Sequence, residues 1–315
     1  MKKEIQGLGK AKKRLRPYYN KVKYGKIYPV LNMAWLCYGR PLIRRYHTSR
    51  IRHLIKEDTF QDVKTFCMFM GHSRSGHSLI SALLDAHPDI VLSDDLDALK
   101  YIDAGFGKTD MYHLILAKSH SHARAGRIRD GRRGKAYYSY AVPGQWQGTC
   151  RKIQIIGDKK GGMTAKRLTA NPGLLQQLRR TVDTSVKLIV VIRNPYDNIS
   201  TRFLRHNRQN TLMHYIDNYF SACRRINDVR KYINPSDILF VRHEAFIENP
   251  EQELTQTCRF LGAGISAEYA KACASIVYKS PVKSRHEIQW EPGLIEIVRT
   301  RMARFDFLAG YSYEN

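Results

Sequence analysis

The octapeptide GHSRSGHS, residues 71–78, decides the fold of this chain. It follows KTFCMFM, residues 64–70, a nearly continuous apolar run of the kind that buried parallel strands show. It precedes residues 78–86, whose apolar periodicity predicts a helix that stops before Pro88. A turn of small residues between a buried strand and a helix directs successive backbone N–H groups at one point. The sequence therefore predicts an anion-binding loop at residues 71–78.

Strands and helices alternate downstream of this loop. Buried strands are expected at residues 153–156, 188–192 (LIVVI) and 238–241. Helices are expected to begin at Asn171-Pro172 and at Pro195, to cover residues 211–233 and 250–261, and to resume at Pro292. This alternation predicts an α/β fold in three layers, α/β/α, around a central parallel sheet. We expect a basic extension at residues 1–60 and the folded domain at residues 61–315.

The composition favours anionic partners. The 315 residues carry a net charge of +25, and the sequence pI is near 9.9. The six cysteines show no CxxC spacing, which argues against a zinc cluster or a disulfide scaffold, and Cys67 fits a buried thiol in a reducing compartment. The apolar run at residues 27–43 is interrupted by Asn32 and Arg40 and is too short to cross a bilayer. We therefore expect a cytoplasmic protein.

The basic N-terminal 60 residues allow two interpretations. One is a solvated arm packed on the domain, and the other is a peripheral docking surface for an anionic membrane or polymer. No motif in the chain indicates nucleic-acid binding.

The loop at residues 71–78 matches the spacing G-x4-G-K-[ST], but His77 stands where nucleotide triphosphatases place lysine. Those enzymes need that lysine and Mg²⁺ on the β- and γ-phosphates. Here a fixed cation, Arg74, lies earlier in the loop. The substitution disfavours a P-loop kinase or NTPase and indicates another anionic ligand.

The stretch GHSRSGHSLISALLDAHPDI, residues 71–90, resembles the 5′-phosphosulfate loop of the PAPS-dependent sulfotransferase superfamily. In that family a G-x-x-[RK]-S-G-[ST]-[ST] turn is followed by an L-L-x-x-H-P helix end. His77 occupies a usual threonine position. The resemblance implies that the 5′-phosphosulfate of PAPS (3′-phosphoadenosine 5′-phosphosulfate) is bound by loop residues, namely Arg74, Ser75, Gly76, His77 and Ser78.

A second stretch, KLIVVIRNPYDNISTRF at residues 187–203, resembles the 3′-phosphate motif of the same family. The resemblance implies phosphate binding by Arg193 and by Thr201, eight positions on, with Ser200 adjacent. SPVKSRHEIQW, residues 280–290, lies where the family carries a basic loop over the nucleotide, so Lys283 and Arg285 are candidates for a second clamp. The resemblance covers residues 65–313 and implies a P-loop NTPase-like sulfotransferase fold.

The resemblance also assigns the transfer chemistry, which needs no metal. The G-D-K strand end places Lys159 at the leaving oxygen, with Lys160 as the alternative. Asp94-Asp95-Leu96-Asp97 follows the loop helix at the spacing of the acidic pair of tyrosylprotein sulfotransferases, which implies that Asp95 is the general base. The alternative bases are three histidines that are matched to neutral pH, namely His113, His120 and His122.

Residues 118–148 interrupt the pattern with a stretch rich in Arg, Gly, Tyr and His, and we expect a long loop there. Its aromatic side chains are candidates for a lid over the acceptor: Tyr137, Tyr138, Tyr140 and Trp146. A solvated loop is the competing interpretation.

Together these features predict a sulfotransferase that moves a sulfuryl group from PAPS to a hydroxyl or amine and releases PAP, adenosine 3′,5′-bisphosphate. The expected acceptor is acidic or polar: a glycan, a peptide tyrosine or a lipid headgroup. Two alternatives remain, a P-loop nucleotide kinase or NTPase and a non-enzymatic polyanion-binding protein.

Overall fold

The chain divides into two units, Met1–His53 and Leu54–Asn315. The computed structural model describes residues 57–129, 138–206 and 209–315, all within the second unit. The expected basic extension at residues 1–60 lies almost wholly outside the described residues. Within them, no helix is both long and apolar enough to cross a membrane.

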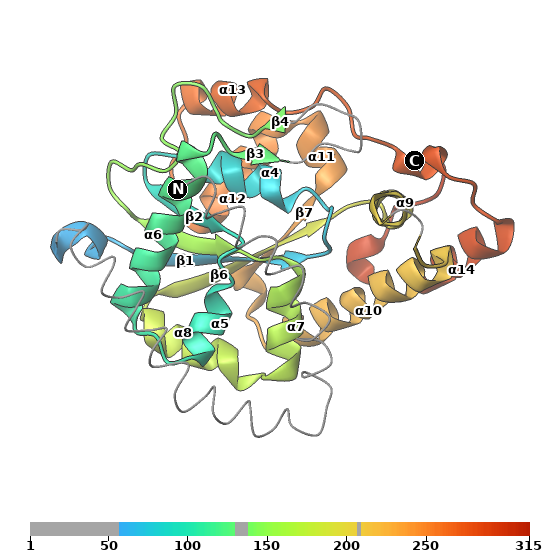
Figure 1. Ribbon diagram of the computed structural model, residues 1–315, viewed down its shortest axis with the longest axis horizontal. Coiled ribbons are helices and arrows are strands. Elements are labelled where there is room, and N and C mark those ends of the chain that lie inside the picture. The colour runs from blue at the N-terminus through green and yellow to red at the C-terminus, as the bar shows by residue number, and fades with distance from the viewer. Residues whose placement is uncertain (1–56, 130–137, 207–208) are drawn as a thin grey trace, which may run out of the picture. The chain divides into compact units, whose positions relative to one another are not determined.

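A five-stranded parallel sheet forms the centre of the described unit, in the order β2-β5-β1-β6-β7 (Figure 1). Its strands are β1 (Thr65–Gly71), β2 (Ile90–Asp94), β5 (Ile155–Lys159), β6 (Ser185–Ile192) and β7 (Ile238–Arg242). All seven residues of β1 are buried, as expected for a central strand covered on both faces. The predicted α/β architecture with a parallel sheet is confirmed.

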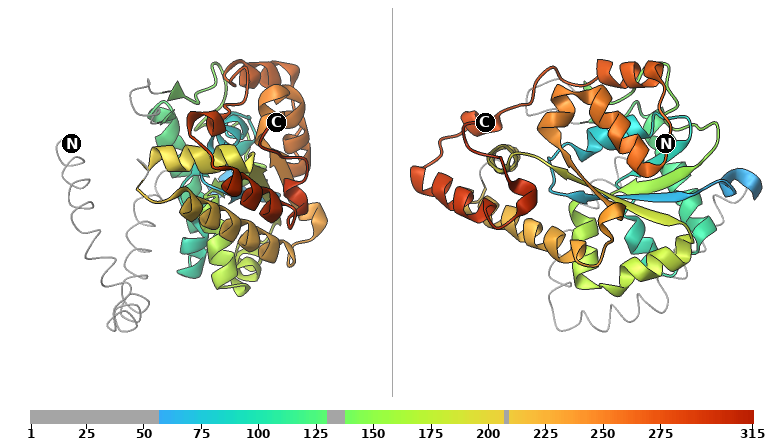
Figure 2. Two further views of the ribbon diagram at one scale, coloured as in Figure 1. Left: turned by 90° about the vertical axis from the view of Figure 1, so that its right-hand side faces the viewer. Right: turned by 180° about the vertical axis from the view of Figure 1, so that it is seen from behind.

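Helices cover both faces of the sheet (Figures 1 and 2). One layer holds α4 (His77–Leu84), α11 (His243–Glu248), α12 (Pro250–Leu261) and α13 (Ala267–Ser275). The opposite layer holds α5 (Ala98–Asp103), α7 (Gly162–Ala170), α8 (Gly173–Val182) and α10 (Leu212–Arg230). The remaining α-helices are α6 (Lys108–Arg124), which packs on β2, and α9 (Pro195–Arg205) and α14 (Pro292–Met302), beyond the carboxyl ends of the strands. Short 3₁₀ turns occur at Glu57–Phe60, Pro235–Asp237, Ser284–Glu287 and Asp306–Leu308.

Two details of the predicted elements are wrong. Residues 118–124 belong to α6 and not to a loop, and β3 (Ile128–Arg129) then pairs antiparallel with β4 (Tyr138–Ser139). The end of α6 lacks an apolar stripe, but it is held in place by Ser119, whose buried hydroxyl donates to Asp85. The helix expected at Asn171 begins at Gly173 without a side-chain cap.

The buried carboxylate of Asp85, at the end of α4, connects four segments. It accepts hydrogen bonds from the backbone N–H of Leu92 at 2.6 Å, from Ser119 Oγ at 2.8 Å and from the N–H of Gly148 at 3.3 Å. It also pairs with the buried guanidinium of Arg127. Burial lowers the pKa of Arg127 to about 10, so this side chain keeps its charge at neutral pH. Asp85 thereby fixes the helix that carries the anion loop to β2 and α6.

Replacing Asp85 with alanine is expected to lower the free energy of unfolding by about 3–5 kcal/mol, because the charge of Arg127 is left buried and unpaired. Chemical denaturation of wild type and variant measures this. Asp306→Ala is the matched control, since it removes an exposed ion pair with Arg230 and should change stability by about 0–1 kcal/mol. Equal losses in the two variants would contradict the role of Asp85.

Candidate active site

A cleft of about 1190 Å³ opens at the carboxyl ends of the central strands. The anion loop, the end of β5 and the start of α9 all contribute to its lining. Of the predicted site residues, it contains Arg74, Gly76, His77, Ser78, Asp95, Lys159, Lys160, Arg193 and Thr201, together with Tyr140. Residues that are more than 100 positions apart in the sequence therefore meet at one site.

The anion loop connects β1 to α4 and is held by side chains from the second motif. Asn198 Nδ2 on α9 donates to the carbonyl of Ser73 at 3.0 Å and to Ser75 Oγ at 3.1 Å. Arg193 Nη1 donates to the carbonyl of Arg74 at 3.3 Å. Ser75 is fully buried, so its hydroxyl supports the loop from behind. These bonds engage the carbonyls of Ser73 and Arg74 and hold the turn in place just before the N-terminus of α4, the end of a helix that favours an anion.

Two glycines permit close contacts between this loop and the segments beside it. Gly76 precedes α4 with a φ of 94°, and a Cβ there would clash with the ring of His243. Gly161, after β5, has a φ of 48°, and a Cβ there would lie 2.7 Å from Nε2 of the loop residue His77. Any side chain at either position would be strained and would displace the ring that it meets. His77, where nucleotide triphosphatases have lysine, thus packs against the turn that follows β5.

Arg193 and Thr201 come together as the second motif predicts. Arg193 Nη1 donates to Thr201 Oγ1 at 3.1 Å, and Thr201 Oγ1 donates to Ser284 Oγ at 2.9 Å. Arg193 Nη2 donates to the carbonyl of Val282 at 2.6 Å. A guanidinium beside two hydroxyls suits a phosphate dianion. Ser284 was not predicted; a lone serine between Lys283 and Arg285 gives no pattern that identifies it.

Three predicted nucleotide contacts lie outside the lining of the cleft. Arg285 is buried in a bidentate ion pair with Asp197, at 2.9 Å, and its Nη1 donates to the carbonyls of Ser312 and Tyr313. It anchors the C-terminal segment. Ser200 is fully buried, and its Oγ accepts from Trp290 Nε1 at 3.1 Å, away from the cleft. Lys283 is exposed, but the cleft is lined by its neighbour Val282 instead.

A group of paired lysines and aspartates lies where β2 and β5 end. Lys159 is buried at the end of β5 and pairs with Asp94, at the end of β2. Its Nζ also lies 3.3 Å from Asp95 Oδ1, and Lys160 Nζ lies 3.6 Å from the same oxygen. Asp94 is buried, whereas the Asp95 side chain is about half exposed to the cleft. Asp95 is therefore the acidic residue of this pair that a ligand reaches.

Partial burial acts to raise the pKa of Asp95, but the two lysines outweigh it and the pKa lies below its ordinary value. Asp95 is therefore ionised over the neutral range. The three histidines named as alternative bases do not line the cleft. His113 is buried beside Phe60, and His120 Nδ1 lies 3.1 Å from the carbonyl of Gly148.

The third, His122, lies next to this charge group but is not part of the cleft lining. Its Nδ1 is 3.9 Å from Asp94, and its pKa is lowered by partial burial and by Lys118. The described geometry therefore favours Asp95 over the three histidines.

Asp158 positions the segment that carries Asp95, a role that the sequence did not reveal. Its buried carboxylate accepts from Ser93 Oγ at 2.7 Å and from the backbone N–H groups of residues 96, 97 and 98 at 2.9–3.1 Å. These bonds turn the chain sharply after β2, where Asp95 adopts a φ of 63°. Burial raises the pKa of Asp158 despite these donors.

The predicted acceptor lid is only partly described. Tyr140 lines the cleft, whereas Trp146 is 39% exposed and lies outside the lining. Tyr137 lies outside the described residues, and the side chain of Tyr138 is not described.

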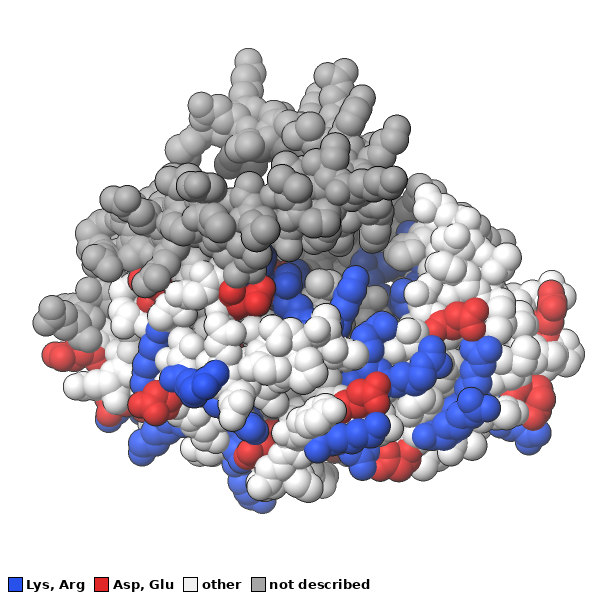
Figure 3. Space-filling model, turned by 90° about the horizontal axis from the view of Figure 1, so that it is seen from below, with Lys and Arg blue, Asp and Glu red and all other residues white. Residues whose placement is uncertain are grey.

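Lys and Arg side chains gather in and beside a hollow on the face shown in Figure 3. Among the lining residues of the cleft that the structure describes, Asp95 and Glu287 are the only carboxylates. Over residues 57–129, 138–206 and 209–315, no group of three or more His, Cys, Asp or Glu side chains could hold a metal ion. The surface and the cleft both favour an anionic ligand.

A family model described as "Sulfotransferase family" matches residues 68–266, which include both anion-binding motifs and the strand that ends at Lys159. The chain belongs to the sulfotransferase family. The expectation from the two motifs is thereby confirmed at the level of the family.

Solved structures with similar folds are sulfotransferases at low sequence identity. The sulfotransferase domain of the curacin biosynthetic pathway is 15% identical with a TM-score of 0.47, over 77% of this chain and 97% of that one. The sulfotransferase domain of the Synechococcus PCC 7002 olefin synthase is 16% identical with a TM-score of 0.42, over 76% and 88%. Mouse sulfotransferase SULT7A1 in complex with PAP is 12% identical with a TM-score of 0.39, over 76% and 74%. No curated protein sequence matches the chain.

Arg285→Gln is expected to destabilise this sulfotransferase by about 3–5 kcal/mol, because it leaves Asp197 buried without its cation. Lys283→Gln, two residues away and exposed, is the control and should change stability by less than about 0.5 kcal/mol. Denaturant titration measures both. A stable Arg285→Gln protein would contradict the anchoring role.

Proposed function

We propose that this sulfotransferase takes its sulfuryl group from PAPS and transfers it to an acceptor hydroxyl, releasing PAP. The observation that carries the proposal is the hydrogen-bonded contact between the two anion motifs. Arg193, beside Thr201, donates to the backbone of the loop at residues 71–78, so two anion sites share one cleft. PAPS carries an anionic group at each end of one ribose, which fits such a pair of sites.

The described residues fit each end of this co-substrate. The N–H groups that begin α4, with Arg74 and Ser78 in the cleft lining, suit the 5′-phosphosulfate. The guanidinium of Arg193 with the hydroxyls of Thr201 and Ser284 suits the 3′-phosphate.

Sulfuryl transfer breaks the S–O bond to the 5′-phosphate as the acceptor oxygen attacks in line, so negative charge develops on the leaving oxygen. Lys159 is the cation at the strand end next to the loop, and we assign it to that oxygen. Its ion pairs with Asp94 and Asp95 hold it in place before a ligand binds. An ammonium that is already oriented needs no reorganisation as the charge develops.

The acceptor hydroxyl must lose its proton, and we assign that proton to Asp95. This carboxylate is exposed to the cleft and ionised at neutral pH. Its lowered pKa makes it a weak base, so it accepts the proton late, as the attacking oxygen becomes acidic through bonding to sulfur.

The cleft lacks the P-loop lysine that the kinase alternative requires. His77 replaces the lysine that P-loop enzymes direct at the β- and γ-phosphates, and its ring packs at Gly161. The polyanion-binding alternative accounts for the net charge, but it requires neither the buried Arg193 cluster nor the glycines that allow close packing around the loop.

Thermal unfolding separates these functions. PAP without Mg²⁺ should raise the Tm, and ATP with Mg²⁺ should not, because the sites match a 3′,5′-bisphosphate. Arg74→Ala and Arg193→Ala should each weaken PAP binding by about 1–3 kcal/mol in calorimetric titration, whereas Arg259→Ala, on the exposed side of α12, should leave it unchanged. Stabilisation by ATP–Mg²⁺ and not by PAP would support the kinase.

The pH dependence of turnover tests Asp95. Since the base works ionised and its pKa is below the ordinary value, kcat should show no acid limb from this group between about pH 5 and 8. Lys160→Ala removes a cation 3.6 Å from the carboxylate, which raises the pKa of Asp95 and moves the acid limb to higher pH.

Lys166→Ala, an exposed lysine on α7, is the control and should leave the pH profile unchanged. Asp95→Asn should abolish turnover and retain PAP binding. Full turnover in Asp95→Asn would exclude Asp95 as the base.

A further inference from the structure

Three arginines that neither motif assigns to the nucleotide also line the cleft: Arg202 and Arg205 on α9, and Arg225 on α10. The spacing of residues 198, 202 and 205 places them on one face of α9. Asn198, on that face, contacts the anion loop, so the arginines continue the same wall of the cleft. The two helices pack against each other, and α10 also packs against α7, which follows Lys159 in the chain.

Two of these arginines have no carboxylate partner in the described part of the chain. Arg202 lies over the ring of Tyr215 at 5.8 Å, and Arg225 Nη1 donates to Ser221 Oγ at 2.9 Å. The Nε atoms of both are buried and have no hydrogen-bond partner. A buried, unused N–H of a guanidinium carries an energetic penalty that a bound anion would remove.

The positive charges of these arginines lower the pKa of two nearby histidines. The pKa of His72 is lowered to about 4, first by burial and then by Arg202 and Arg225. The pKa of His206 is lowered by burial and by Arg202 and Arg74. Both histidines are therefore neutral near pH 7, and the arginines supply the positive charge there.

The nucleotide accounts for only part of the positive charge in the cleft. Its two anionic ends are matched by the loop with Arg74 and by the Arg193 cluster, and Lys159 is already paired with Asp94. Arg202, Arg205 and Arg225 are additional to these groups. We propose that they form a third anion subsite, which binds a fixed negative group on the acceptor itself.

This inference rests on the proposed function and narrows its substrate class. The acceptor is a hydroxyl compound that carries a carboxylate, sulfate or phosphate close to the hydroxyl that is sulfated. A neutral acceptor would leave Arg202 and Arg225 without a carboxylate partner among the described residues.

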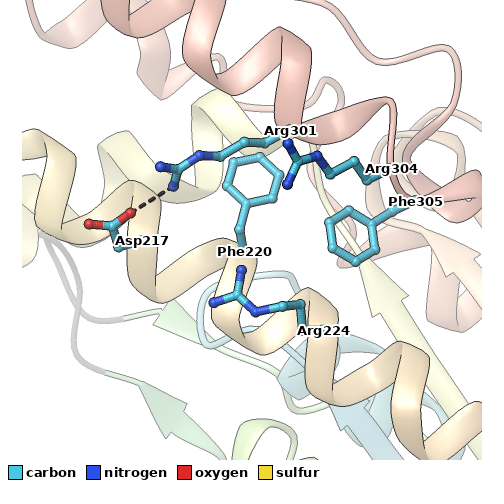
Figure 4. A pocket seen from close by; sticks show the side chains of 6 residues that line it. All are labelled: Asp217, Phe220, Arg224, Arg301, Arg304 and Phe305. Carbon is cyan, nitrogen blue, oxygen red and sulfur yellow. Dashed lines mark hydrogen bonds and ion pairs between the residues drawn. The ribbon is translucent and has the colours of Figure 1, made fainter.

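Arg224, the neighbour of Arg225 on α10, provides a matched control. Arg224 points into a separate cavity of about 490 Å³, together with Phe220, Arg301, Arg304 and Phe305 (Figure 4). Arg301 in that cavity is paired with Asp217 at 2.6 Å, but Arg224 and Arg304 are exposed. Arg224→Gln/Arg304→Gln therefore removes the same charge as Arg202→Gln/Arg225→Gln without changing the cleft.

The experiment is a calorimetric titration of the PAP-saturated protein with matched acidic and neutral probes. One pair is an unsulfated chondroitin tetrasaccharide and its carboxyl-reduced form. The other is a tyrosine peptide flanked by glutamates and its glutamine counterpart. The acidic member of at least one pair should bind about tenfold more tightly than the neutral member, and the pair that responds shows whether a glycan or a peptide supplies the anion.

Arg202→Gln/Arg225→Gln should abolish this preference and change PAP affinity by less than about twofold, whereas the Arg224→Gln/Arg304→Gln control should retain the preference. If the cleft double variant does not fold, the two single variants are measured in its place.

Three outcomes would overturn the inference. In the first, the wild type binds the acidic and neutral probes equally or binds neither. In the second, the Arg224→Gln/Arg304→Gln control loses the preference for the acidic probe as fully as the cleft variant does. In the third, the cleft variant loses as much affinity for PAP as it loses for the probe. The last outcome would assign the arginines to the nucleotide. Failure of PAP to bind the wild type would refute the proposed function, and the probes would then be titrated into the free protein to judge the third subsite by itself.

Discussion

The hydrogen bonds from Arg193 and Asn198 to the loop backbone set the geometry of the whole cleft. Both donors lie at the start of α9, and both acceptors lie in the turn between β1 and α4. Strands β1 and β6 are hydrogen-bonded neighbours in the sheet, with Gly71 opposite Val191, so their carboxyl ends deliver the two turns side by side. The contact engages the carbonyls of Arg74 and Ser73 and holds the turn beside the guanidinium of Arg193. A turn of small residues held at a helix N-terminus in this way suits an anion.

A second constraint is the network of buried carboxylates that supports the site. Asp85 fixes the end of α4, Asp158 shapes the turn that carries Asp95, and Asp197 anchors Arg285 and the C-terminal segment. Each carboxylate is buried and satisfied by several donors, as the cost of burying a charge requires. The strongly basic chain therefore uses many of its acidic residues for structure, and the cleft is left with a positive surface.

The electrostatics of the cleft separate two functions along the sheet. Near β2 and β5, lysines alternate with aspartates. This arrangement suits a site that must both accept a proton and stabilise negative charge on a leaving oxygen. Near α9 and α10, Arg202, Arg205 and Arg225 line the cleft, which suits recognition of an anionic group. Two neutral histidines also line the cleft, His72 in the loop itself and His243 at the start of α11; burial and neighbouring arginines lower the pKa of each, to about 4 and about 3. Neither adds charge to the cleft near neutral pH.

The sequence by itself determined the fold class and the turn at residues 71–78, because these depend on local patterns. The proximity of Arg193 and Thr201 was implied by the resemblance of residues 187–203 to a family motif. Apolar runs of four to eight residues specify buried strands, and a turn of small residues specifies the loop. It also located helix α12, whose end at Gly262 follows from the left-handed backbone at that residue.

Only the tertiary structure decided which polar residues face the cleft. Arg285 and Ser200 look like ligand contacts in the sequence, but packing buries them against Asp197 and Trp290. Conversely, no motif assigned a role to Ser284, to Asp158 or to the arginines of α9 and α10. Their positions depend on contacts between segments up to about 90 residues apart. Local patterns fix where a chain forms strands and turns, whereas the orientation of a polar side chain depends on the elements that pack around it.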